Sequence, residues 1–326
     1  MNPCLSPDTA HLAARTMILR DELASILRAC RDRSLICAPL RGIALAEQLY
    51  GGNALRPTGD IDLLVRRMDL PRMSALLTEL GYEPMEHRPG FAGSFSYTLE
   101  FVKDRHGWIV VEPHWTLAYP PFTDALDMDA VWNRCRAGRV AGVDTLLLGH
   151  EDLLVHLCAH LLHHGDKAPP LWWHELDLLI RQTGTSLNWD TIVESVERSG
   201  QSFLVAGVLQ TLRDRFQTPF PPPVLIRLAA RPQTSSTLLL VQASHLSSRE
   251  EFARFVSLPD MRAKWRYALG LLFPSPAYMK RRYKVQHPVR LGWAYAARVF
   301  HIGWEGLRWT GALLQAACAS RIPLPR

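Results

Sequence analysis

The chain has 326 residues, of which 48% are hydrophobic and 21% are charged. This composition excludes a wholly disordered chain, a collagen-like repeat and a small disulfide-stapled protein, and the length favours two domains with an appendage. The formal net charge of +6 is uneven, because residues 261–326 hold twelve Lys and Arg side chains and one acid, which leaves a net charge of −5 on the rest. A basic end on an acidic body indicates an anionic partner, such as nucleic acid, a phospholipid surface or a phosphorylated molecule.

The sequence favours a cytoplasmic protein. The longest uncharged stretch, roughly 232–248, is rich in Ser, Thr and Gln, so we expect no membrane span there. The N-terminus lacks the basic start and apolar run of a secretory signal. The six cysteines are scattered and form no C-x-x-C pair, which favours buried thiols in a reducing compartment over zinc sites or disulfides.

The first part of the chain alternates helical and strand patterns. Helical spacing of apolar residues, Gly-containing helix ends and period-two alternation define five elements and a hairpin. The expected elements are, in order, a helix over 9–32, a strand over 34–40, a helix over 43–50, a strand over 59–65, a helix over 69–81, and a hairpin of strands over 95–104 and 107–117.

From about Thr123 onward the pattern is helical, and a run of three prolines at 221–223 indicates a stiff connector. We therefore predict three parts: a domain over 1–122 with an N-terminal helix, a helical domain over 123–218, and a basic, Trp-rich helical region with its connector over 219–326.

Two acids carry the strongest chemical signal. Asp60 and Asp62 are separated by one residue in a predicted strand, so both carboxylates face one way with about 7 Å between their Cα atoms. Carboxylates this close repel one another unless they are solvated or hold a cation, and Mg²⁺ is the hard ion that oxygen ligands suit. Glu112, in a neighbouring predicted strand, is a plausible third ligand. The alternative is a solvated strand end with ordinary acids.

The turn before these acids is a candidate phosphate site. Gly42 lies between a predicted strand and a helix, where backbone N–H groups favour anions. Arg41 and Arg56 could add bidentate phosphate contacts. Alternatively, Gly42 only eases a tight turn. The sequence contains no P-loop and no dinucleotide-binding glycine pattern.

Taken together, these motifs resemble the uncharacterised bacterial nucleotidyltransferase-like family of the DNA polymerase β-like nucleotidyltransferase superfamily. The resemblance covers roughly residues 35–200. The motifs that carry it are Arg41-Gly42-Ile43-Ala44-Leu45, Leu49-Tyr50, Arg56-Pro57-x-x-Asp60-Ile61-Asp62-Leu63-Leu64-Val65, Glu112-x-His114-Trp115, Glu151-Asp152-x-Leu154, His156-Leu157-Cys158-x-His160-x-x-x-His164, Leu178 and Asn188-Trp189-Asp190.

The resemblance implies an α+β protein with a nucleotidyltransferase-fold mixed sheet and flanking helices, followed by a helical domain and a basic helical C-terminal segment. It also implies nucleotidyl transfer from an NTP with release of pyrophosphate. By motif match, Asp60, Asp62 and Glu112 would bind two Mg²⁺ ions, and Gly42 would lie beside the phosphates.

Three histidines recur every four residues in one predicted helix: His156, His160 and His164. Zinc is the alternative, although no H-E-x-x-H pattern accompanies them. We expect His160 or His164 to pack against the sheet and, with His114, to line an acceptor cleft, while Asp177 orients one of them. Otherwise Glu175 and Asp177 are solvated helix acids.

The basic end interleaves cations with aromatic side chains. This pattern fits capture of an anionic acceptor (a peptide, a small molecule or RNA), or peripheral contact with an anionic membrane. Packing of solvated helices on the body is the alternative. The residues concerned are Lys280, Arg281, Arg282, Lys284, Trp265, Trp293, Trp304 and Trp309.

The predicted function is Mg²⁺-dependent transfer of a nucleotidyl group from an NTP to a hydroxyl or phosphate acceptor. Two other functions remain open. The same metal site could serve transfer from a nucleotide-sugar in peptide natural-product maturation, or the chain could be a non-catalytic binding module that retains the fold.

Overall fold

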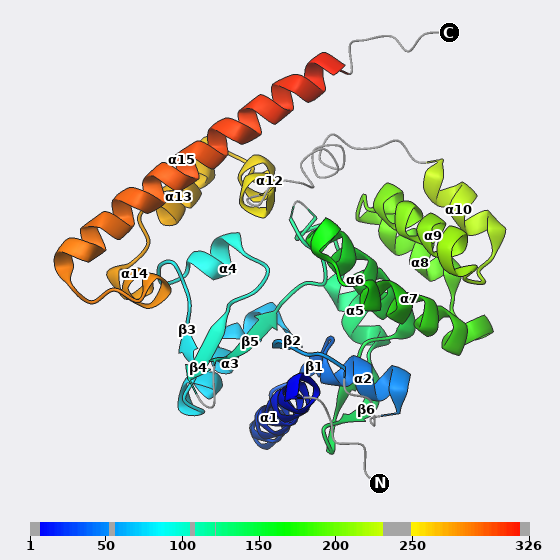
Figure 1. Ribbon diagram of the computed structural model, residues 1–326. Helices are drawn as coiled ribbons and strands as arrows, with labels where there is room; N and C mark the ends of the chain where they lie inside the picture. Colours follow the sequence, from blue (N-terminus) through cyan, green and yellow to red (C-terminus); the bar gives the residue numbers. More distant parts are fainter. Residues whose placement is uncertain (1–6, 52–55, 105–107, 121, 231–248, 320–326) are drawn as a thin grey trace.

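The computed structural model describes residues 7–51, 56–104, 108–120, 122–230 and 249–319. It has a mixed sheet with helices on both sides, a bundle of helices beside it, and a long C-terminal helix at one end of the molecule (Figure 1). The α+β class predicted from the sequence is confirmed.

The central sheet has five strands in the order β1-β2-β5-β4-β3. Strands β2 and β5 are parallel, and the other neighbouring pairs are antiparallel. The expected hairpin is present as β4 and β5, but its first strand begins only at Phe101. The strands are β1 (Cys37–Pro39), β2 (Ile61–Val65), β3 (Glu83–Pro84), β4 (Phe101–Asp104) and β5 (Trp108–His114).

Helices cover both faces of this sheet. Because successive strand residues point to opposite faces, Leu63 and Val65 pack into one core with α1 and α3, whereas Leu64 packs into the other core with the helical bundle. Asp62 alternates with Leu63 and therefore faces the helical bundle. The helices of the first part are α1 (Pro7–Asp32), α2 (Ile43–Tyr50), the 3₁₀ turn η1 (Arg67–Asp69), α3 (Leu70–Glu79) and α4 (Phe91–Phe95).

The expectation of uninterrupted helix after residue 123 is wrong for one segment. After α5 (Met128–Arg134), strands β6 (Arg136–Val140) and β7 (Val143–Leu147) form a hairpin. Ala141 and Gly142 have φ values of 52° and 78°, as a two-residue hairpin turn requires. Val140, Val143 and Leu147 join the core around α1, so this hairpin packs with the first domain although it follows residue 122.

The helical bundle lies against the other face of the sheet, and its core includes Leu40 and Leu64. Part of the proline run is helical, because α10 begins at Pro222, where the N–H that proline lacks would have no partner within the helix. The bundle comprises α6 (His150–His164), η2 (Gly165–Lys167), α7 (Pro170–Thr183), η3 (Gly184–Ser186), α8 (Trp189–Arg198), α9 (Ser202–Phe216) and α10 (Pro222–Ala229).

The basic end folds as helices, as predicted. It contacts the first domain through a small core in which Phe95 packs with Leu258 and Tyr267. The uncharged stretch 232–248 lies outside the described residues. Within the described part of the chain, no helix combines the length and apolar character needed to cross a membrane. The C-terminal helices are α12 (Arg249–Ser257), α13 (Met261–Leu272), α14 (Pro276–Tyr283) and α15 (Pro288–Ala319).

Candidate metal and nucleotide site

The parallel pairing of β2 and β5 builds the candidate site. Asp62 is the register partner of Glu112, and His114 lies two residues further along β5 on the same face. All three side chains therefore project from the centre of the sheet toward the helical bundle. Asp62 and His114 are buried, and Glu112 is partly exposed.

Asp62, Glu112 and His114 converge closely enough to share one ion. Each offers a ligand atom, and these atoms lie within 4.8 Å of one another. His114 Nε2 is 3.0 Å from Asp62 Oδ1 and 3.5 Å from Glu112 Oε2. The sequence placed His114 in the acceptor cleft, whereas the structure places it between two of the predicted metal ligands.

Asp60 lies immediately before β2 and is half-buried. Repulsion from Asp62, followed by burial and repulsion from Glu112, raises the pKa of Asp60 to about 7. Asp62 and Glu112 are thus close enough to Asp60 to raise its pKa.

Two cationic side chains balance this negative charge. Arg41, between β1 and α2, places Nη2 2.7 Å from Asp62 Oδ2 and also contacts His160. Burial favours protonation of Asp62, but Arg41 and the hydrogen bond from His114 outweigh it and hold the pKa of Asp62 below its usual range. Burial lowers the pKa of His114, yet hydrogen bonds to Asp62 and Glu112 prevail and raise it to about 9.

The donor set fits a hard divalent cation. The carboxylates of Asp62 and Glu112 meet at one place, and Asp60 is close enough that repulsion from Asp62, together with burial, raises its pKa to about 7. Mg²⁺ prefers oxygen ligands, so Asp60, Asp62 and Glu112 suit it better than the imidazole of His114 does.

Gly42 is required by the local geometry. Its φ is 59°, and a Cβ at this position would lie 2.8 Å from Cγ2 of Thr58, on the segment that leads to Asp60. The close approach of the two chain segments sets the start of α2 beside the carboxylates. Gly42 therefore allows a tight turn, and this turn lies next to the candidate site.

Arg56 forms a buried ion pair with Glu175. Its Nε and Nη2 donate to the two carboxylate oxygens of Glu175 at 2.5 and 3.0 Å, and its Nη1 donates to the carbonyl of Pro57 at 3.1 Å. Both side chains are buried. Two guanidinium nitrogens thus tie the segment before β2 to α7, and the third binds the neighbouring carbonyl. The phosphate contact expected of Arg56 stays a prediction. Glu175 is correspondingly not a solvated acid.

His156, His160 and His164 of α6 form a stripe, called the histidine stripe below, that faces the candidate site. His160 Nδ1 lies 3.1 Å from the hydroxyl of Tyr119, and its ring is 4.2 Å from that of Trp172 between centroids. His156 Nδ1 donates to the carbonyl of Leu117 at 3.2 Å. Burial, and then the charge of Arg41, lowers the pKa of His160 and lowers that of His156 to about 3, so both imidazoles are neutral. Among the described residues, the stripe gathers no set of three metal-ligating side chains.

Asp177 does not orient these histidines. Its carboxylate accepts hydrogen bonds from Arg181 Nε at 2.9 Å and from the Thr218 hydroxyl at 2.7 Å, which joins α7 to the end of α9. It is buried, so it is not a solvated helix acid either. His164 is exposed at the end of the stripe, where its ring meets those of His160 and Trp172.

Sequence reasoning missed Tyr119 and did not assign Trp172 to this cluster. Tyr119 follows β5 in an irregular segment with no periodic pattern, and Trp172 is typical of a core position. Their proximity to His160 follows from how α6 and α7 pack on the sheet, which no local motif records.

Comparisons with known proteins find one matching family and similar solved structures. The model of a family described as uncharacterised nucleotidyltransferase matches residues 5–217. Two solved structures of ANT(2'')-Ia, one in solution as an antibiotic-resistance factor and one in a crystal with adenylyl-2''-tobramycin, are similar to 62% and 60% of this chain and to 94% and 98% of theirs. Each shares 18% sequence identity with it, with TM-scores of 0.38 and 0.36. No curated protein matches the chain.

Proposed function

The chain belongs to this family of uncharacterised nucleotidyltransferases, and from that premise we propose that it moves a nucleotidyl group from an NTP to a hydroxyl or phosphate acceptor in a Mg²⁺-dependent reaction. The observation that carries the proposal is the pairing of Asp62 with Glu112 across two parallel strands, with Asp60 beside them. The acceptor oxygen attacks the α-phosphorus, the bond from this phosphorus to the oxygen that bridges it to the β-phosphate breaks, and pyrophosphate leaves. A hydroxyl acceptor releases its proton to solvent in this step.

Asp60, Asp62 and Glu112 would hold two Mg²⁺ ions. When bound, such ions neutralise triphosphate charge and lower the pKa of an attacking oxygen. The protein's own contribution is to fix three carboxylates on a rigid sheet, so that the ligands need little rearrangement.

Arg41 has a second role in this proposal. Its guanidinium now neutralises Asp62, and a divalent cation bound to that carboxylate would take over this task. Arg41 would then be able to pair with a phosphate oxygen at the same place, beside Gly42 and the start of α2.

The histidine stripe suits the acceptor side. Neutral His156 and His160 accept or donate hydrogen bonds without adding charge, and Tyr119 and Trp172 add flat apolar surfaces. Nε2 of His156 is buried without a hydrogen-bond partner, so it can receive a polar group from a bound molecule. We propose that a hydroxyl-bearing acceptor binds against this surface.

The test is calorimetric titration of the protein with each NTP and with a nucleotide-sugar, with and without Mg²⁺. We expect Mg²⁺-dependent binding of an NTP, and we expect Asp62→Asn to abolish it, because the substitution removes both a negative ligand and metal affinity. Asp144→Asn, at an exposed position of β7, is the matched control and should bind as the wild type does. Binding of the nucleotide-sugar alone would favour the second activity, and an unaltered Asp62→Asn variant would refute the site.

A further inference from the structure

Helix α15 carries an apolar stripe that faces away from the rest of the described molecule. Figure 1 shows this helix running past α13, on the side of the molecule away from the sheet. Five large apolar side chains on it are between 56% and 75% exposed. Their spacing of four, seven, four and three residues puts them on one side of a helix with 3.6 residues per turn. They are Val289, Trp293, Phe300, Trp304 and Leu307.

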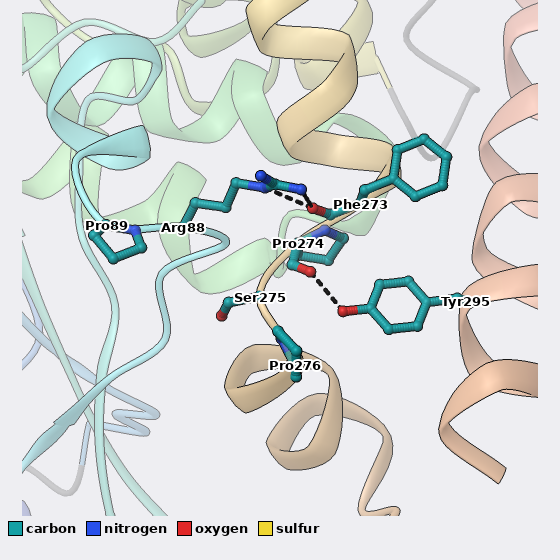
Figure 2. Close-up of a pocket in the computed structure, with 7 residues that line it drawn as sticks. All are labelled: Arg88, Pro89, Phe273, Pro274, Ser275, Pro276 and Tyr295. Atoms are coloured by element: carbon teal, nitrogen blue, oxygen red, sulfur yellow. Dashed lines mark hydrogen bonds between the residues drawn. The ribbon is translucent and has the colours of Figure 1, made fainter. Parts of the chain in front are cut away.

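The opposite side of α15 packs against the other C-terminal helices and the segment between them. The Tyr295 hydroxyl donates to the carbonyl of Pro274 at 2.6 Å, and Arg298 Nε donates to the carbonyl of Leu271 at 2.6 Å. Further along, Trp309 is buried and stacks on Phe252 of α12 at 4.4 Å between centroids. Figure 2 shows the Tyr295 contact beside a cavity at the joint with the 273–276 segment. The apolar stripe is thus exposed on a helix that is already packed.

Two arginines and a histidine lie along one flank of the stripe. Arg290, His301 and Arg308 each follow a stripe residue by one position, and all three are exposed. The only acid between Met261 and Trp309 is Glu305, which is buried and pairs with Arg308 at 2.9 Å. In the described part of this region the exposed surface therefore combines large apolar side chains with cations and presents no exposed acid.

We propose that this face of α15 lies on the surface of a lipid bilayer with anionic headgroups. An interfacial helix has large apolar side chains, including Trp and Phe, on one face and Lys or Arg beside them. The indole rings suit the boundary between headgroups and acyl chains. The net charge of +11 over 261–326 attracts an anionic surface from solution.

A second copy of the chain is a poorer occupant. Two such faces packed together would bring two sets of arginines near one another, with no exposed acid on either helix to compensate. Charge complementarity thus favours phospholipid over self-association. The proposal does not depend on the reaction catalysed at the carboxylate site.

The experiment is flotation of the full chain with vesicles made of equal parts phosphatidylglycerol and phosphatidylcholine, or of phosphatidylcholine alone. We expect binding to the mixed vesicles, weaker binding to neutral vesicles, and weakening as salt rises. Trp293→Ser with Phe300→Ser should lower the partition coefficient by about tenfold or more, because two side chains lose their burial in lipid.

Matched controls separate this effect from general loss of apolar surface. Ile226→Ser with Met68→Ser removes two side chains that are just as exposed, but on other elements, and should leave binding unchanged. A second stripe variant, Trp304→Ser with Leu307→Ser, should repeat the loss. Thermal unfolding should be unaltered in all variants, since each side chain is exposed.

Three results would overturn the proposal. Stripe variants could bind vesicles as tightly as the wild type, or the wild type could bind neutral and anionic vesicles equally. Alternatively, light scattering could show a dimer that the stripe variants convert to monomer, which would assign the face to a second copy.

Discussion

At the scale of single residues, the candidate site depends on backbone geometry as much as on its acids. Gly42 and Gly184 share a conformation, with φ/ψ of 59°/−117° and 53°/−126°. A Cβ at Gly42 would meet Thr58 at 2.8 Å, whereas a Cβ at Gly184 would meet nothing within 4 Å. Comparing substitutions at the two glycines therefore separates the cost of backbone strain from the cost of the close contact with Thr58.

We predict that Gly42→Ala costs more stability than Gly184→Ala, by about 1–3 kcal/mol, because both substitutions strain the backbone but only the first displaces Thr58. Since Thr58 precedes Asp60 by two residues, Gly42→Ala should also weaken Mg²⁺-dependent nucleotide binding. Urea unfolding and calorimetry measure the two effects. Equal losses in the two variants would show that the contact with Thr58 is unimportant.

The buried pair of Arg56 and Glu175 yields a second prediction. Glu175→Leu leaves a buried guanidinium without its partner and should lower the free energy of unfolding by about 3–5 kcal/mol. Adding Arg56→Met should recover most of this loss, because the unpaired charge is removed. Denaturant unfolding of the single and double variants tests this. A double variant that is stable but has lost NTP binding would assign Arg56 to the phosphate site.

The two arginines also show what the sequence can and cannot reveal about a site. The D-x-D spacing predicted that Asp60 and Asp62 would lie together, because strand geometry is local. Glu112 was placed correctly in a neighbouring strand. By contrast, the contacts of Arg41 with Asp62 and of Arg56 with Glu175 depend on tertiary packing. In the sequence the two arginines look alike, because each is a cation near a turn.

At the scale of elements, the joint between the first domain and the C-terminal helices contains a titratable group. The ring of His87 stacks on Tyr278 of α14 at 4.5 Å between centroids, and its carbonyl accepts from the Ser275 N–H at 2.6 Å. Phe91 of α4 packs on the same imidazole. Burial, together with the nearby charges of Arg298 and Arg282, lowers the pKa of His87 to about 4.

This pKa shift predicts that acid loosens the joint. An exposed histidine has a pKa near 6.5, so the opened joint binds a proton more readily than the closed one. Stability of the closed joint is therefore fully present above about pH 6.5 and is lost as the pH falls toward 4.

Hydrogen exchange of α13 and α14 amides should rise over this range. His87→Phe, which keeps a ring on Tyr278, should remove this pH dependence of exchange. The control His287→Phe, at an exposed position, should leave the pH dependence as it is in the wild type. The same pH dependence in His87→Phe would contradict the assignment.

Element prediction succeeded where the pattern was local. The helices at α1, α2 and α3 and the strand β2 were predicted from spacing, and the structure confirms them. The hairpin of β6 and β7 was missed because its strands alternate weakly. Arg136 and Gly138 are only partly buried, and Val140 and Leu147 are buried by packing into the core around α1. The Ala141-Gly142 turn is the signal that could have revealed it.

At the scale of the whole molecule, the uneven charge corresponds to a physical division. The acidic body holds the carboxylate site, and the basic end forms helices that dock on it partly through Arg281, which pairs with Glu83. Arg281 is thereby engaged within the protein, and capture of an anionic acceptor by the 280–284 segment stays a prediction. The family expected from the motifs is confirmed, and its model ends at residue 217, before α10 begins.

The measurement that tests the central claim most directly is mass spectrometry of hydroxyl-bearing and phosphate-bearing acceptors after incubation with the full chain, mixed NTPs and Mg²⁺. The account predicts a mass gain equal to one nucleotidyl group, release of pyrophosphate, and loss of both products in Asp62→Asn while Asp144→Asn retains them. A gain equal to a sugar or a single phosphate, or a nucleotidyl gain that persists in Asp62→Asn, would contradict it.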